Sequence, residues 1–195
     1  MNSYGAIILA AGQSSRLGKP KQLLEYKGKK LLQHAIDAVT PIVHENFRVV
    51  LGAYTSEILT SFEPVSFPYV HNEEWPLGMA TSLKTGLTSL LNQTSVEGIF
   101  LLVSDQPFVD SEIVKSLLDK HIKENKKLVA SAYGHTLGVP AFIHATYFDE
   151  LLGLKQDAGA KKLFYRYSSD LAQLDFPKGS FDVDTQEDFL KLIQP

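Results

Sequence analysis

The segment Gly12–Lys21, with the sequence GQSSRLGKPK, gathers glycines, hydroxyls and cations in one short stretch. Backbone N–H groups, hydroxyls and cations together can surround a polyphosphate. A Walker A loop is excluded, because five residues separate Gly12 from Gly18 and Pro20 stands where that loop needs Ser or Thr. The segment does not match a GxGxxG fingerprint either. The alternative interpretation is a solvated basic turn, since charged side chains are usually exposed. Its hydroxyls belong to Ser14 and Ser15, and its cations are Arg16, Lys19 and Lys21.

Two carboxylates follow apolar runs further along the chain. Asp105 comes just after IFLLV, the most hydrophobic run of the sequence, and Pro107 turns the chain away from a continued strand. Asp184 ends the stretch FDVD near the C-terminus, with Asp182 as a second candidate in the same stretch. Hard oxygen ligands suit Mg²⁺, which binds through one or two carboxylates plus substrate phosphates. For Asp182 and Asp184 a capping or turn role is the alternative.

The pattern around these residues predicts alternating strands and helices. The predicted strands are 4–10, 47–51, 68–71, 99–103 and 127–132, and the predicted helices are 31–43, 56–62, 78–91 and one capped by Asp110. A strand pair over 139–143 and 171–176 and a last helix after a capping box at Thr185 complete the pattern. This order predicts an α/β fold, a Rossmann-like three-layer α/β/α arrangement with a mainly parallel sheet and a small added β element near the C-terminal part. Such sheets bind ligands outside the carboxyl ends of their strands.

Length and composition narrow the class of protein. The 195 residues predict a single domain over 1–195, and the absence of Cys excludes a disulfide framework, a thiolate metal site and a cysteine nucleophile. A net charge of −3 argues against nucleic-acid binding. The apolar stretch 6–11 is too short to span a membrane and no basic leader precedes it, so we expect a cytoplasmic protein without a membrane partner. The spacing of the six His does not suggest a metal site.

The loop pattern Leu9-Ala-Ala-Gly12, Ser14-x-Arg16-x-Gly18 and Pro20-Lys21-x-Leu23 resembles the signature loop of nucleotidyltransferases of the glycosyltransferase-A-like fold, which also includes nucleotide-diphospho-sugar transferases. Three later stretches, NEEWPLGMATSL at 72–83, LLVSDQP at 101–107 and FDVDT at 181–185, narrow the resemblance. In order and spacing they are similar to the molybdenum cofactor cytidylyltransferase family, a MobA-like branch related to the guanylyltransferase of the same pathway. The resemblance spans nearly the whole chain.

The resemblance implies roles for individual residues. Arg16, Lys21 and Asp105 would be catalytic, and Asp105 and Asp184 would hold Mg²⁺. The nucleotide would be bound by Leu9, Ala10, Ala11, Gly12, Ser14, Arg16, Lys21, Asn72, Gly78 and Ser82. The alternative for Ser82, and for Gly86 beside it, is a small residue that lets a helix pack closely. Trp75 could stack on a ring, although lone aromatic residues usually serve packing.

The sequence departs from the family at two places. The family carries Gly-His-Pro where this chain has Gly138-Val139-Pro140, and Gly-Asp-x-Gly-Ala-Arg where this chain reads QDAGAK over 156–161. Val139 lies in the region of the second substrate, so nucleotidyl transfer is predicted while the acceptor stays open.

We therefore expect transfer of CMP from CTP to a phosphorylated acceptor, molybdopterin by resemblance, with Mg²⁺ and release of pyrophosphate. Positioning and charge neutralisation would suffice without a side-chain nucleophile. One alternative is a nucleotidyltransferase of the same fold that uses GTP or acts on a sugar phosphate. Another is a non-catalytic module that handles a nucleotide or the molybdenum cofactor. A molybdoenzyme or chaperone partner is possible under either reading.

Overall fold

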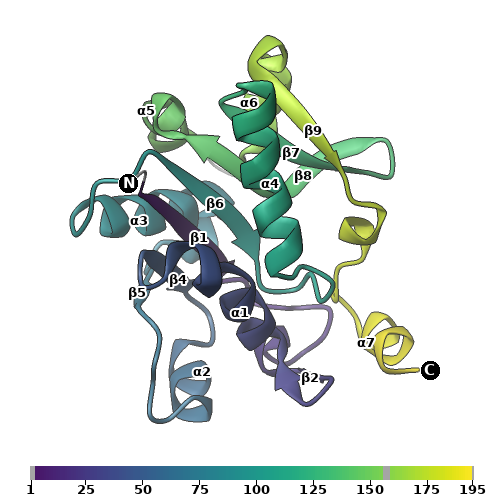
Figure 1. Cartoon of the computed structure of the whole chain (residues 1–195). Coiled ribbons are helices and arrows are strands. Elements are labelled where there is room, and N and C mark those ends of the chain that lie inside the picture. The colour runs from purple at the N-terminus through teal and green to yellow at the C-terminus, as the bar shows by residue number, and fades with distance from the viewer. Residues whose placement is uncertain (1–2, 156–158, 195) are drawn as a thin grey trace.

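The computed structural model describes residues 3–155 and 159–194, and these residues form a seven-stranded sheet covered by helices on both faces (Figure 1). The strands of this sheet are β1 (Tyr4–Ala10), β4 (Phe47–Leu51), β5 (Tyr69–His71), β6 (Gly98–Val103), β7 (Leu128–Tyr133), β8 (Thr136–His144) and β9 (Leu171–Asp175). The helices are α1 (Leu31–Val43), α2 (Thr55–Ser61), α3 (Met79–Leu91), α4 (Ser111–Glu124), α5 (Phe148–Leu152), α6 (Lys161–Arg166) and α7 (Gln186–Ile193). Strands β2 (Glu25–Tyr26) and β3 (Lys29–Lys30) pair as a separate small ribbon.

Alternation along the central strand β1 builds the two sides of the core. Side chains point to opposite faces at successive strand positions, so Ile7 and Leu9 join one buried cluster while Ala6 and Ile8 join the other. The first cluster is completed by α3, α5 and α6, and the second by α1, α2 and α4. A parallel strand buried on both faces reads as a continuous apolar run, as YGAIILA does. The predicted three-layer α/β/α fold is confirmed.

Helix α3 lies directly on the sheet because it carries Gly86 at the contact. A Cβ at this position would lie 2.7 Å from Val50 Cγ2 and 2.8 Å from Ile7 Cγ2, closer than real Cβ contacts. The interpretation of Gly86 as a residue that allows close packing is confirmed. Helix α3 therefore sits at a fixed height over β1 and β4, and its N-terminal end is held beside the loops that follow those strands.

The strand order β5-β4-β1-β6-β8-β7-β9 places a switch point between β1 and β6. After β1 the chain adds β4 and then β5 on one side, and β6 pairs on the other side of β1. Loops that leave neighbouring parallel strands in opposite directions open a crevice at the carboxyl ends of those strands. The glycine-containing loop follows β1 and Asp105 follows β6, so both border this crevice.

The expectation that 139–143 and 171–176 form a strand pair is wrong. Strand β7 lies between β8 and β9: it pairs antiparallel with β8 and parallel with β9. The short turn at Gly134, whose φ is +53°, makes β7 and β8 a hairpin, and β9 then adds to the free edge of β7. The added strands near the C-terminal part therefore belong to the main sheet, in which β8 runs antiparallel to both neighbours.

Two predicted helix starts are confirmed. Asp110 accepts a hydrogen bond of 3.0 Å from Ile113 N–H at the start of α4. Thr185 and Asp188 form a reciprocal capping box at the start of α7.

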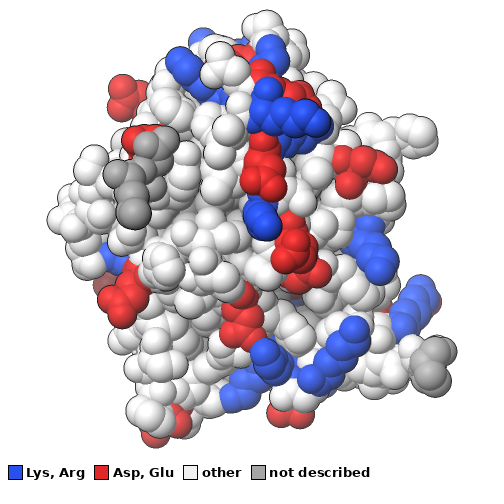
Figure 2. Space-filling view, viewed as in Figure 1, with Lys and Arg blue, Asp and Glu red and all other residues white. Residues whose placement is uncertain are grey.

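The surface carries both signs of charge. Figure 2 shows Lys and Arg side chains interspersed with Asp and Glu over the face in view, in keeping with a net charge of −3. Across the part of the chain that the structure describes, every helix is too short or too polar to cross a bilayer.

Candidate functional site

The loop after β1 is fastened at both ends, so that Lys21 projects into the crevice. The N–H groups of Leu17 and Gly18 both donate to Ser14 O at 3.0 Å, and Gly18 takes a φ of +72° that favours glycine. At the far end Gln22 Nε2 donates to Ala10 O at 2.6 Å, which ties the loop back to β1. These contacts fold the segment into a compact turn that is tied back to the end of β1.

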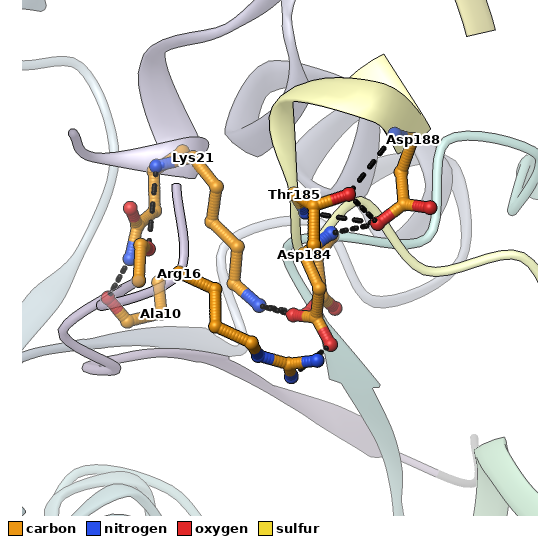
Figure 3. A network of polar contacts seen from close by, with 9 residues as sticks. Ala10, Arg16, Lys21, Asp184, Thr185 and Asp188 are labelled. Atoms are coloured by element: carbon orange, nitrogen blue, oxygen red, sulfur yellow. Dashed lines mark hydrogen bonds and ion pairs between the residues drawn. The ribbon is translucent and has the colours of Figure 1, made fainter. Parts of the chain in front are cut away.

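Lys21 lies between two carboxylates from distant parts of the sequence. Its Nζ donates to Asp105 Oδ2 and, at 2.9 Å, to Asp184 Oδ1. Arg16 reaches the other oxygen of Asp184, Oδ2, at 2.7 Å. Figure 3 shows Arg16 and Lys21 extending side by side from the loop toward Asp184, which precedes α7. The structure thus brings together the three residues predicted to be catalytic and both predicted metal ligands.

The electrostatics of the cluster favour the charged forms of Lys21 and Asp184. Burial by itself acts to lower the pKa of Lys21, but Asp105 and Asp184 outweigh it and the pKa is raised. Partial burial acts to raise the pKa of Asp184, yet hydrogen bonds from Lys21 and Arg16 prevail and lower it. Desolvation and the neighbouring charge of Asp105 raise the pKa of Asp182 to about 6, although its side chain keeps contact with solvent.

Asp105 and Asp184 supply carboxylate oxygens, which are suitable ligands for a divalent cation. Within residues 3–155 and 159–194, no group of three or more His, Cys, Asp or Glu side chains is arranged to hold a metal ion. Asp105 and Asp184 nevertheless converge on one cation, and the buried Asp105 Oδ1 finds no hydrogen-bond partner among the described residues. Mg²⁺ commonly uses one or two carboxylates and takes its remaining ligands from phosphates and water. Asp182 makes no ion pair with Lys21 or Arg16 in the described part of the chain, so the geometry favours Asp184 as the second ligand.

A pocket of about 340 Å³ opens beside this cluster. Its volume is at the lower end of the range for small-molecule sites. The predicted nucleotide-binding residues that line it are Leu9, Ala10, Ala11, Gly12, Lys21, Gly78 and Ser82. Ser14 and Arg16 belong to the adjoining loop and are not among the lining residues described. The pocket is therefore continuous with the charged cluster through Lys21 and Asp105.

Asn72 lies behind the pocket, with only 2% of its surface exposed. Its amide nitrogen donates to Thr81 Oγ1 at 2.9 Å and to Ser82 Oγ at 3.0 Å, and its oxygen accepts from Glu74 N–H. These bonds hold the turn 75–77 against the start of α3. A direct contact of Asn72 with a nucleotide stays a prediction, while its structural contacts place Ser82 on the pocket wall.

Four lining residues were missed by sequence reasoning: Gln22, Met79, Val103 and Ser104. Trp75, which was considered as a residue that could stack on a ring, also lines the pocket. Gln22 is fully buried, and its Oε1 has no partner among the described residues. Its position directly after Lys21 could have indicated a place in the site, but a single Gln in a sequence gives no sign that its side chain is buried.

The back wall of the pocket depends on Gly52, which follows β4. A Cβ there would lie 2.7 Å from Ala11 O and 2.9 Å from Trp75 Cβ. Gly52→Ala is therefore expected to push the β1 loop and Trp75 apart and to raise KM for the predicted nucleotide by about tenfold, because displaced pocket walls contact the ligand less well. Steady-state kinetics measure KM, and thermal unfolding checks that the variant is folded. A folded variant with unchanged KM contradicts this role.

Asp184 is positioned by the cap of α7. Asp188 Oδ2 accepts from Thr185 N–H at 2.9 Å and from Asp184 N–H at 3.3 Å, and Asp188 N–H donates to Thr185 Oγ1 (Figure 3). The hydrogen bond from Val183 N–H to Asp105 O, 3.0 Å long, joins this segment to the end of β6. The backbone on both sides of Asp184 is thus held by hydrogen bonds.

Removing the Thr185 hydroxyl tests this arrangement. Thr185→Ala is expected to lower the free energy of unfolding by about 1 kcal/mol, because the cap satisfies N–H groups that the helix leaves open. Urea denaturation measures the loss, and Thr185→Ser, which keeps the hydroxyl, serves as the control. Equal stability of the Ala and Ser variants would show that the cap adds nothing.

The C-terminal segment is anchored outside the main core. Val183 and Leu192 pack with Leu24 and Leu31 in a cluster separate from the two that cover the sheet. Gln106 Nε2 adds a hydrogen bond of 2.8 Å to Gly179 O. In Figure 1, α7 lies beside the β2 ribbon and away from the sheet.

The basic residues that follow in the sequence do not all serve the site. Lys29 pairs with Asp37 on α1, and Lys30 donates to Ser61 O. Lys27 lies over the ring of Tyr26, and Lys19 lies over that of Phe189. The excess of positive charge over 16–30 therefore reaches the carboxylates only through Arg16 and Lys21, within the described part of the chain.

The departures from the family pattern divide between described and undescribed residues. Val139 lies on β8, and its carbonyl accepts from Tyr133 Oη at 3.0 Å. Gln156, Asp157 and Ala158 lie outside the described residues.

A wider hollow of about 880 Å³ lies at the opposite end of the strands, where β4 begins. Asp37 and Glu45 line it together with Arg48 and His44. Arg48 is buried, and its guanidinium bonds to neutral acceptors, among them Phe47 O and Ser89 Oγ. The charged cluster and the glycine-containing loop lie at the carboxyl ends of the strands, so the smaller pocket is the candidate site.

A mainly parallel sheet, a cation-bearing loop after its first strand and two converging carboxylates define a nucleotidyltransferase of the glycosyltransferase-A-like fold. The chain belongs to the MobA-like NTP transferase domain family, whose model matches residues 6–171. The resemblance predicted from the sequence is thereby confirmed.

Relatives with assigned names point to the same class. The bifunctional protein GlmU of Lawsonia intracellularis is 31% identical over 120 residues, which cover 60% of this chain and 26% of that protein. A probable molybdenum cofactor guanylyltransferase of Natranaerobius thermophilus is 27% identical over 66% of this chain and 60% of its own length. The chain thus spans about a quarter of the first relative and three fifths of the second.

The fold also matches solved structures. Rv0371c from Mycobacterium tuberculosis H37Rv superposes with a TM-score of 0.82 and 27% identity over 100% of this chain and 98% of that one. A second structure of that protein is described as a complex with manganese and has a TM-score of 0.77 and 25% identity over 98% of both chains.

Proposed function

We propose that this protein transfers a nucleoside monophosphate from a nucleoside triphosphate to a phosphorylated small-molecule acceptor, with Mg²⁺, and releases pyrophosphate. The observation that carries the proposal is the convergence of Lys21 and Arg16 with Asp105 and Asp184 at the mouth of the 340 Å³ pocket. In such a reaction the cations can bind the phosphates, and the carboxylates can bind the metal that accompanies the phosphates.

In the proposed reaction an oxygen of the acceptor phosphate attacks the α-phosphorus in line. The bond from that phosphorus to the bridging oxygen breaks, and pyrophosphate leaves with the electron pair. Lys21 and Arg16 neutralise charge that develops on the phosphoryl oxygens, and N–H groups of the loop after β1 hold the phosphates. Asp105 and Asp184 would hold Mg²⁺, which supplies Lewis-acid stabilisation of the same oxygens when bound.

We propose CTP as the nucleotide, on the resemblance of the motifs to the cytidylyltransferase branch. GTP is the second candidate, favoured by the guanylyltransferase relative.

We propose molybdopterin, with its terminal phosphate, as the acceptor. The relative named molybdenum cofactor guanylyltransferase supports this class, and a sugar phosphate is the alternative suggested by the GlmU relatives. A non-catalytic cofactor-handling module is disfavoured, because a purely binding role would not call for the paired carboxylates at Lys21. A molybdoenzyme or a chaperone would be the downstream partner, and the reaction would take place in the cytoplasm.

The experiment that tests the proposal has two parts. Thermal unfolding with CTP, GTP, UTP or ATP plus Mg²⁺ identifies the nucleotide, because preferential binding to the folded state raises Tm. Pyrophosphate release is then measured with the selected nucleotide and with molybdopterin or a sugar phosphate. Tm is expected to rise most with CTP, and pyrophosphate release should require molybdopterin. A lack of pyrophosphate release with every combination of nucleotide and acceptor would rule out the proposed nucleotidyl transfer.

A further inference from the structure

The ammonium of Lys21 stands where the two carboxylates would meet a metal ion. Nζ contacts Asp105 Oδ2 and Asp184 Oδ1 at the same time, and 14% of the Lys21 and Asp105 side chains is exposed. A divalent ion bound by the same two oxygens would need the same space. The protein therefore cannot place Lys21 and the metal between these oxygens together.

The charges of the cluster are already balanced. Asp105 and Asp184 bring two negative charges, and Lys21 and Arg16 bring two positive ones, with Arg16 on Asp184 Oδ2. Adding a divalent cation to these four ion-paired groups would leave two excess positive charges among them, which the neighbouring Asp182 would offset only in part, and this is unfavourable in a partly buried site. Exchange of two monovalent side-chain cations for one divalent ion keeps the balance.

We propose that Lys21 and Arg16 are resident counter-ions of the carboxylate pair, and that a divalent metal enters in exchange for them when a triphosphate draws both cations away. This inference rests on the proposed function for the identity of the triphosphate. Both cations sit on the loop that would hold the phosphates, so a short movement of their side chains exchanges one set of oxygens for the other. Arg16 is 69% exposed, so packing leaves its side chain free to move, and the rotatable bonds of the Lys21 stem allow its ammonium to shift although only 14% of that side chain is exposed.

The exchange has a consequence for the order of binding. Without nucleotide, a metal must compete with two tethered cations and binds weakly. With a triphosphate present, the phosphates take the cations and add their own oxygens as ligands, so metal and nucleotide bind together. The carboxylates are then never left bare, which avoids uncompensated charge in a partly buried position.

The test measures metal binding by the nucleotide-free protein. Mn²⁺ is titrated into the full chain, and free Mn²⁺ is followed by electron paramagnetic resonance. Lys21→Met removes the charge and keeps an unbranched side chain, and we expect it to bind Mn²⁺ about tenfold more tightly than the unsubstituted protein. Lys21→Arg keeps the charge and is expected to bind as weakly as the unsubstituted protein.

Two controls separate exchange from a general change of charge. Lys19→Met removes the same charge from the same loop, but Lys19 lies over the ring of Phe189, so its effect should stay below about twofold. Adding Asp105→Asn to Lys21→Met should abolish the gain, because one of the two carboxylates is lost. A gain for Lys19→Met as large as that for Lys21→Met would overturn the proposal.

Affinity of Lys21→Met equal to or below that of the unsubstituted protein also overturns it. Circular dichroism confirms folding of each variant. If Lys21→Met does not fold, Arg16→Met replaces it, since Arg16 is exposed, and a gain in Mn²⁺ affinity is again the expected result. The titration contains neither nucleotide nor acceptor, so it stands apart from turnover: failure of every nucleotide to react would remove the proposed function and leave the exchange measurable.

Discussion

Asp105→Asn is expected to lower kcat/KM for nucleotidyl transfer by about 10³-fold, because removing one preorganised electrostatic partner of the transition state has an effect of this size. Asn has nearly the same shape as Asp, so the change removes the charge at Lys21 without creating a cavity. The Asp105 side chain is 14% exposed, and its lost charge would be poorly replaced by water. Pyrophosphate release under saturating and limiting nucleotide separates kcat from KM.

The matched control for this variant is Asp37→Asn. Asp37 pairs with Lys29 at 2.5 Å on the outer surface of α1. The substitution therefore removes a lysine–aspartate contact that is remote from the pocket. Its kcat/KM is expected to stay within about twofold of the unsubstituted value, since exposed ion pairs contribute little. Activity of Asp105→Asn at the level of this control would exclude Asp105 from the chemistry.

Gly86→Val is expected to lower the free energy of unfolding by about 3 kcal/mol, the upper range for overpacking a close contact. The added carbons would push α3 away from Val50 and Ile7, whose methyl groups already lie within van der Waals distance of the helix. Because the N-terminal end of α3 carries Gly78 and Ser82, the pocket should widen together with the loss of stability. Urea denaturation gives the free energy.

Thr88→Val provides the comparison on the same helix. Thr88 is exposed on α3, and Val has nearly its shape, so stability should change by less than about 0.5 kcal/mol. A loss for Gly86→Val no larger than this would mean that the helix accommodates the added bulk. The close approach of α3 to the sheet would then not be required.

Strands buried on both faces could be located from the sequence because their composition leaves few alternatives. The runs at β1 and β4 were predicted with the bounds that the structure has, and the start of α4 was predicted from Asp110 and that of α7 from the capping box of Thr185 and Asp188. Strand neighbours could not be read in this way. The insertion of β7 between β8 and β9 depends on a hairpin turn and on pairing between segments far apart in the sequence.

The site residues that belong to a motif could be predicted from the sequence, whereas those whose position depends on packing could not. Lys21, Asp105 and Asp184 were identified from motifs, and the structure places them in contact. The sequence left open whether Asp182 or Asp184 joins Asp105, because both belong to the same short stretch, FDVD. The cap of α7 separates them: Asp184 N–H is bonded to Asp188, and its carboxylate is turned to Lys21. The buried Gln22 depends on three-dimensional packing that its neighbours in sequence do not reveal.

The C-terminal segment is anchored separately from the sheet, so the part of the site that it carries differs in local stability from the part on the sheet. The small cluster of Leu24, Leu31, Val183 and Leu192 holds this segment, while the sheet is held by two much larger clusters. Elements with few buried contacts open at a lower free energy than the whole molecule. An opening of the segment would carry Asp184 away from Lys21 while leaving Asp105 fixed on β6. The Asp105 side of the charged cluster is therefore anchored by the main core, whereas the Asp184 side depends mainly on the small cluster, and we expect local opening of the segment to separate the two carboxylates while the sheet stays folded.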